Sequence, residues 1–156
     1  MSTRCAIIRR REDGRYEGVY CHSDGYPAWT GAILQVHYTD PDKVAELLAL
    51  GNLSILGPRV SPDPDRPHGF GWDERQKGVT VAYGRDRDGE PDVGPVVGPT
   101  CCGVARRIWH DGHIYVFEDG AWTHNGEPLA EVLAGLEGGD ADLAKRAIDC
   151  EEEKQG

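Results

Sequence analysis

The segment from Asp40 to Gly51 constrains the fold most strongly, because it carries both the start and the stop signals of a helix. Asp40 can cap the first turn, Pro41 suits the first helical position, and Gly51 can adopt the left-handed conformation after the end. An apolar stripe lies between these signals, at Val44, Leu47 and Leu48. Residues 28–38 also show helical spacing, so we expect two helices with a short link to cover one face of a sheet.

Turn residues divide the rest of the sequence into short elements. Residues 3–10 and 15–22 have the pattern of a hairpin around Glu12-Asp13-Gly14. Further strands are expected at 79–83, 102–109, 113–117 and 121–123, and C-terminal helices near 128–138 and from residue 140. This order predicts an α+β fold with a mostly antiparallel sheet, two N-terminal-half helices packed on one face and one or two C-terminal helices.

The length of 156 residues fits a single domain, which we place at residues 1–150, with a frayed acidic tail at 151–156. Four prolines lie within residues 57–78, which predicts a long irregular loop. His68, Phe70 and Trp72 lie inside this loop. Because a disordered linker has little use for aromatic side chains, we expect these residues to hold the loop against the body of the domain.

The net charge of −10 comes entirely from residues 61–156, since the charges of residues 1–60 sum to zero. An acidic surface repels phosphate backbones, so broad nucleic-acid binding is not expected. No apolar run is long enough to cross a bilayer, and the N-terminus lacks the apolar stretch of a secretory signal. The odd number of cysteines, five, is a poor disulfide framework. We therefore expect a cytoplasmic protein that makes no membrane contact.

Two segments dense in polar and aromatic residues, 20–27 and 80–90, each follow a predicted strand. Gly25 and Pro27 turn the backbone after the first strand, so the polar groups are expected on a loop. Together the two loops predict a surface that binds a ligand or a partner. Its candidate residues are His22, Asp24, Tyr26, Tyr83, Arg85 and Arg87.

Arg85 and Arg87 admit two interpretations. Two arginines at this spacing could form a clamp for phosphate or carboxylate. Alternatively, the acidic residues interspersed with them, Asp86 among them, pair with both on the surface, and alternating charges slightly favour this second interpretation.

Catalytic and metal chemistry has weaker support. Residue types that can bind a metal occur at Cys21, His22, Asp24, Cys101, Cys102, His110 and His113. Adjacent residues on a strand point to opposite faces, however, and this spacing is unlike that of a structural zinc site. Buried apolar cysteines are the favoured interpretation, and we expect no metal, no cofactor and no catalytic residue.

The sequence resembles a family of small proteins encoded by tailed phages, prophages and related mobile elements. The resemblance lies in the opening Met1-Ser2-Thr3-Arg4, in residues 20–27, in residues 48–57 and in residues 80–87. The usual family pattern is MSTR…YCHWDGYP…LIALGDISSLG…TVAYHRDRGE, and the similarity extends over about residues 1–123. The chain departs from it with Ser23 for tryptophan, Asn52 for aspartate, Gly84 for histidine and an additional Asp88.

The resemblance implies a biological context rather than a mechanism. Accessory genes of phages often act on the host, for example as inhibitors of bacterial defence. The leading hypothesis is a non-enzymatic accessory protein that binds a host protein. One alternative is a small-molecule binder that sequesters a nucleotide-like signal, with Arg85 and Arg87 on phosphate and Tyr26 or Tyr83 stacked on the base. The other alternative is a metal- or cysteine-dependent enzyme.

Overall fold

The computed structural model describes residues 3–87 and 94–149. The expected tail at 151–156 and the additional Asp88 of the resemblance lie outside these residues. The described strands are β1 (Cys5–Arg10), β2 (Tyr16–Ser23), β3 (Leu53–Ile55), β4 (Val81–Ala82), β5 (Val96–Gly98), β6 (His113–Glu118), β7 (Ala121–His124) and β8 (Glu127–Pro128). The helices are the π-helical turn η1 (Pro27–Gly31), α1 (Ala32–His37), α2 (Pro41–Ala49), α3 (Tyr83–Asp86), α4 (Cys101–Arg106), α5 (Leu129–Ala134) and α6 (Gly138–Ile148).

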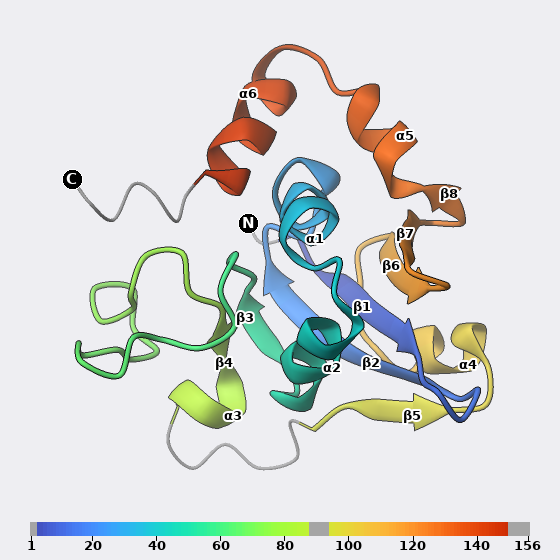
Figure 1. The fold of residues 1–156 in the computed structure, drawn as a ribbon, viewed down its shortest axis with the longest axis horizontal. Helices are drawn as coiled ribbons and strands as arrows, with labels where there is room; N and C mark the ends of the chain where they lie inside the picture. The colour runs from blue at the N-terminus through green and yellow to red at the C-terminus, as the bar shows by residue number, and fades with distance from the viewer. Residues whose placement is uncertain (1–2, 88–93, 150–156) are drawn as a thin grey trace.

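The described strands form one sheet in the order β4-β3-β2-β1-β6-β7-β8 (Figure 1). The outer edge of β2 is shared by two partners, because residues 16–18 pair with β5 and the end of the strand pairs with β3. Asn52 covers the backbone between them, since its side-chain oxygen accepts the N–H of Tyr20 at 3.0 Å. Among the described strands, β1–β6 and β2–β3 are the only parallel pairs, so the expected α+β class with a mostly antiparallel sheet is confirmed.

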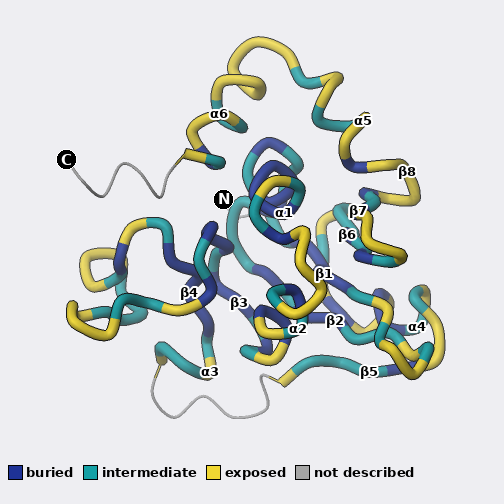
Figure 2. Tube along the Cα trace, viewed as in Figure 1, coloured by how far each residue is buried: buried dark blue, intermediate teal, exposed yellow. Residues whose placement is uncertain are grey.

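Both faces of the sheet are covered by helices. On one face α1 and α2 bury Leu34, Tyr38 and Leu47 against residues of β1 and β2 such as Ile7 and Val19. On the opposite face, a smaller cluster is formed by Ala6, Ile8, Val104, Ala105 and Ile108, where α4 packs on the sheet. Figure 2 shows the buried residues in these central elements and more exposed residues in α5 and α6. The prediction that two N-terminal-half helices cover one face is therefore confirmed.

Three local predictions need correction. The strand expected at 102–109 is a helix, α4, because the Thr100 side chain accepts the N–H of Gly103 and caps its first turn. The helix expected at 28–38 is divided, since it begins as the π-helical turn η1 and continues as α1. The strand expected at 79–83 is confined to Val81–Ala82, and β3, which the sequence analysis did not predict, lies beside it.

The close packing of α4 on the sheet predicts a strong effect of Gly18→Ala. A Cβ atom at Gly18 would lie 2.8 Å from Cγ1 of Ile8 and 2.9 Å from Cδ1 of Ile108. Because overpacking displaces neighbouring elements, we expect the free energy of unfolding to fall by about 1–3 kcal/mol in urea titrations. In the control variant, Gly139→Ala, the new Cβ meets no atom within 4 Å, and stability should be unchanged or higher. Equal stability of the two variants would contradict this packing.

Candidate functional site

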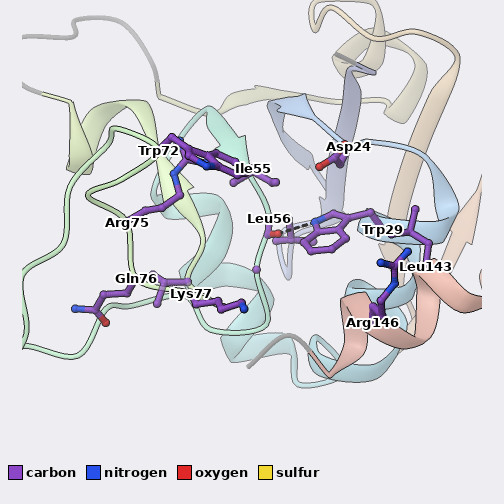
Figure 3. A pocket seen from close by; sticks show the side chains of 13 residues that line it. Asp24, Trp29, Ile55, Leu56, Trp72, Arg75, Gln76, Lys77, Leu143 and Arg146 are labelled. Atoms are coloured by element: carbon purple, nitrogen blue, oxygen red, sulfur yellow. Dashed lines mark hydrogen bonds between the residues drawn. The ribbon is translucent and has the colours of Figure 1, made fainter. Parts of the chain in front are cut away.

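A cavity of about 530 Å³ lies between the irregular segment 57–78, the end of β3, η1 and α6 (Figure 3). Its volume is within the range of about 300–1,000 Å³ that is typical of small-molecule sites. Segments that are far apart in the sequence therefore meet here. The cavity is lined by Asp24, Trp29, Ile55, Leu56, Gly57, Trp72, Arg75, Gln76, Lys77, Gly78, Val79, Leu143 and Arg146.

Two tryptophans provide flat apolar surface in the cavity. Trp29, on η1, is held by a hydrogen bond from its Nε1 to the carbonyl of Leu56 at 3.0 Å. Trp72, on the irregular segment, is 77% exposed, and its ring lies 5.1 Å from the guanidinium carbon of Arg75. The ring of Trp29 is thus fixed by the fold, whereas most of the surface of Trp72 is accessible to a ligand.

The charged residues of the cavity are mostly cationic. Arg75 and Lys77 come from the irregular segment and Arg146 comes from α6, whereas Asp24 is the one carboxylate in the lining. With each cation counted as +1 and the carboxylate as −1, the lining has a formal charge of +2. The whole chain carries −10. This local excess of positive charge favours an anion.

Arg75 is a cation that the protein compensates incompletely. One of its terminal nitrogens donates to the carbonyl of Phe70 at 2.8 Å, but its buried Nε has no hydrogen-bond partner among the described residues. Burial lowers the pKa of Arg75, and the charge of Asp86 opposes this effect only in part. An anion bound beside this guanidinium would compensate its charge.

Asp24 is held in a conformation that few non-glycine residues adopt. Its φ is 55°, in the left-handed region. The backbone N–H and the hydroxyl of Thr30 both donate to its carbonyl, at 3.3 and 2.7 Å. The hydroxyl of Tyr26 donates to its Oδ1 at 2.9 Å. Both the backbone and the carboxylate of Asp24 are therefore fixed by hydrogen bonds.

The irregular segment is organised around the side chain of Gln76, which is 6% exposed. Its Nε2 donates to the carbonyls of Asp63 and Arg66, both at 3.0 Å, and its Oε1 accepts the N–H of Asp63 at 2.9 Å. These bonds satisfy backbone groups that have no helical or strand partner. The loop expected at 57–78 is thus present as an irregular segment with internal hydrogen bonds that place Trp72 and Arg75.

Arg85 holds the ends of this segment rather than facing solvent as a free clamp. Its Nε and one terminal nitrogen donate to both oxygens of Asp86, at 2.8 and 2.9 Å. The terminal nitrogens also donate to the carbonyls of Val60 and Thr80, each at 2.6 Å. The donors that would hold a phosphate are therefore engaged within the protein. Arg85 is thus paired with an acidic neighbour, as in the second interpretation of this motif. The pair differs from that interpretation in that Asp86 is buried and not on the surface.

Asp86 is the buried anion of this arrangement, with a side chain that is 5% exposed. Burial raises its pKa, but the hydrogen bonds from Arg85 and the Ala82 N–H, with the charges of Arg85 and His68, lower it overall. Nε2 of His68 lies 3.5 Å from Oδ1 of Asp86. His68, one of the residues expected to hold the loop against the domain, thus contacts the buried carboxylate of Asp86.

His22, Tyr83 and Arg87 belong to a different surface from the cavity. His22 Nδ1 lies 2.5 Å from the hydroxyl of Tyr20. Tyr20 packs against the α4-side cluster, which places this pair on the opposite face of the sheet from α1 and α2. Arg87 lies over the rings of Phe70 and Tyr83, at 5.4 and 6.0 Å.

Tyr83 connects the two predicted loops on this surface. Burial raises its pKa, Tyr20 and Cys21 raise it further, and a hydrogen bond with Ser54 lowers it. Of the six predicted site residues, His22 thus contacts Tyr20, whereas Tyr83 and Arg87 contact each other, and all three lie outside the cavity lining. Asp24 lines the cavity, Tyr26 donates a hydrogen bond to its carboxylate, and Arg85 supports the irregular segment.

The residues proposed for metal or thiol chemistry do not assemble into such a site in the part of the chain that the structure describes. There, no group of three or more histidine, cysteine or acidic residues could hold a metal ion. Cys21 is fully buried opposite Cys5 in the sheet. Nδ1 of His113 lies 2.8 Å from Nε2 of His124. Burial is the main cause that lowers the pKa of both histidines.

Comparison with protein-family models, curated proteins and solved structures finds no match. Within the described residues, no helix is both long and apolar enough to span a membrane. The fold and the cavity therefore define the class: an α+β protein with a cationic, tryptophan-lined cavity.

The buried network predicts that Asp86→Asn destabilises the protein. The change removes the charge that compensates Arg85, whose side chain is 25% exposed. We therefore expect the free energy of unfolding to fall by about 2 kcal/mol, less than the ~3–5 kcal/mol for a fully buried pair. Urea unfolding at pH 7 would measure it, with the exposed Asp73→Asn as the unaffected control.

The same variant has a predicted pH dependence. The folded-state pKa of Asp86 lies below its ordinary value of 3.8. Its contribution is therefore complete above that value and is lost as the pH falls through the folded-state pKa. The difference in stability between wild type and Asp86→Asn should shrink below about pH 3.8. A difference that stays constant across this range would contradict the assigned role of Asp86.

Proposed function

We propose that this protein is a non-enzymatic binding protein that sequesters a small phosphorylated aromatic ligand, of the nucleotide class, in the cavity. The observation that carries the proposal is the combination of two tryptophans with three cations in one cavity of about 530 Å³. A nucleotide has the matching combination of a flat ring and an anionic group.

Electrostatics supports the anionic part of the ligand. Arginine matches phosphate geometry with paired donors, and lysine provides a point charge. Arg75 is the strongest candidate contact, because it lines the cavity beside Trp72 and the charge of Asp86 offsets the burial of its guanidinium only in part. In a partly enclosed site such a pair is less screened by water and salt than on an open surface.

The tryptophans support the aromatic part. Stacking of a base on an aromatic side chain contributes about 1–3 kcal/mol, and every base presents a ring face for it. Trp72 is 77% exposed, an unusual state for so large an apolar side chain. A stacked ligand ring would cover that surface and give Trp72 a partner in addition to Arg75.

The biological role that we propose combines this site with the resemblance to proteins of phages and mobile elements. An accessory protein of this kind, present in the cytoplasm of a bacterial host, would act by removing a nucleotide-like signal from solution. Sequestration needs tight binding but no reaction. The assigned residues accordingly bind and orient the ligand.

A second candidate function, binding of a host protein, has its own observation. Aromatic side chains outside the cavity lining make two contacts, Tyr20 with His22 and Phe70 with Tyr83. Arg87 lies over the ring of Phe70, and all five residues are half-buried to exposed. Aromatic residues and arginine are enriched in protein interfaces. Arg87→Glu would weaken a host-protein complex formed there and would leave nucleotide affinity unchanged.

The proposed function predicts the effect of removing cavity cations. Arg75→Gln and Arg146→Gln should each weaken nucleotide binding by about tenfold or more, since a hydrogen bond to a charged group contributes about 1.5–3 kcal/mol. Isothermal titration calorimetry with nucleoside mono-, di- and triphosphates would measure the affinities. Arg106→Gln, an exposed change on α4, is the matched control and should bind normally.

Trp72→Ala tests the aromatic part separately. We expect a loss of about 5- to 150-fold in affinity, from the stacking contribution of about 1–3 kcal/mol. Because Trp72 is largely exposed, the variant should remain folded in thermal melts. If wild-type protein binds no nucleotide in the calorimeter, and native mass spectrometry of protein from a bacterial host shows only the bare mass, the proposed function is wrong.

A further inference from the structure

We infer that the cavity selects guanine among the nucleobases and that Asp24 is the residue that determines this specificity. The inference rests on the proposed function, because it assumes that a nucleotide binds in this cavity. It is carried by the position and the fixed geometry of the one carboxylate in the lining.

An ionised carboxylate accepts hydrogen bonds and donates none. Guanine presents two neighbouring donors on its pairing edge, N1–H and the 2-amino group, which match the two oxygens of a carboxylate. Adenine and cytosine present one donor beside a ring nitrogen that accepts, and uracil presents one donor between two carbonyls. Their acceptors would face the charge of Asp24, so the same group attracts guanine and repels the other bases.

The carboxylate is preorganised for such a contact. The hydrogen bond from Tyr26 to Oδ1 fixes its orientation, and the bonds from Thr30 fix its backbone at φ 55°. Burial, followed by the bond to Asp24, raises the pKa of Tyr26 to about 12. Tyr26 therefore remains a donor near neutral pH, and both oxygens of Asp24 retain lone pairs for a ligand. Strained backbone of this kind is often found at ligand sites.

The arrangement of the cavity fits a guanine nucleotide. Asp24 and Trp29 lie on one side and Trp72 and Arg75 lie on the other (Figure 3). A base that lies between Asp24 and Trp72 can place its pairing edge on the carboxylate and its ring against Trp72, with its sugar and phosphate directed toward the irregular segment. The phosphate then approaches the cationic side chains of the irregular segment, Arg75 and Lys77.

The test compares three purine nucleotides that differ only at the pairing edge. Guanosine monophosphate should bind most tightly, inosine monophosphate, which lacks the 2-amino group, more weakly, and adenosine monophosphate at least about tenfold more weakly than guanosine monophosphate. Asp24→Asn should reduce the preference for guanine over adenine to less than about threefold, because the amide has one acceptor and one donor. Asp142→Asn, on the exposed part of α6, is the matched control and should keep the preference.

The outcomes separate this inference from the proposed function. If no nucleotide binds the wild type, the proposed function fails and the inference fails with it. If the three nucleotides bind equally, or if Asp24→Asn keeps the preference, the inference is wrong and the proposed function stands. Asparagine tolerates positive φ, so this variant should fold. Tyr26→Phe is a second variant, which leaves Asp24 in place and should reduce the preference by loosening the carboxylate.

Discussion

The cavity depends on how an irregular segment of backbone satisfies its hydrogen bonds without a helix or a strand. The segment leaves the body of the domain at Gly57, whose carbonyl accepts the hydroxyls of Tyr38 and Thr80 at 2.8 and 3.1 Å. Within the segment, the side chain of Gln76 donates to the backbone carbonyl of Asp63. At its ends, Arg85 donates to the carbonyls of Val60 and Thr80. Because these hydrogen bonds satisfy its backbone groups, the segment can present cavity residues at defined positions.

In the charged motif after β4, the two arginines have different roles: one supports the structure and the other lies at the surface. In sequence, Arg85 and Arg87 are equivalent candidates for binding an anion. In the structure, the buried carboxylate of Asp86 accepts two hydrogen bonds from the guanidinium of Arg85, whereas Arg87 lies over the rings of Phe70 and Tyr83. The sequence alone cannot assign these roles, because Asp86 is buried only when residues 60–80 fold back against it. Arg85 thus acts on the cavity indirectly, by holding the segment that carries Trp72 and Arg75.

Local signals predicted the elements that have strong caps and periodicity. The helix after Asp40 and the strand at 113–117 are close to their expected bounds. The error at 102–109 arose because Val104, Ala105 and Ile108, which have helical spacing, were interpreted as strand residues. Among cavity residues only Asp24 was predicted. Trp72 was expected only to hold the loop against the domain. No local sequence pattern marks Arg146 as a site residue, because it reaches the cavity only through the packing of α6 against η1.

The charge distribution decides what kind of binding this protein can perform. An exterior that is strongly acidic overall repels anions at long range, an effect that decays within about 8 Å at physiological salt. Inside the cavity the nearest charges are three cations, Arg75, Lys77 and Arg146, and one carboxylate, Asp24, and low dielectric strengthens the net attraction for an anion. A small anion can therefore bind although a polyanion such as DNA is repelled along its length. This contrast is the electrostatic basis of the proposal that the protein binds a nucleotide and not a nucleic acid.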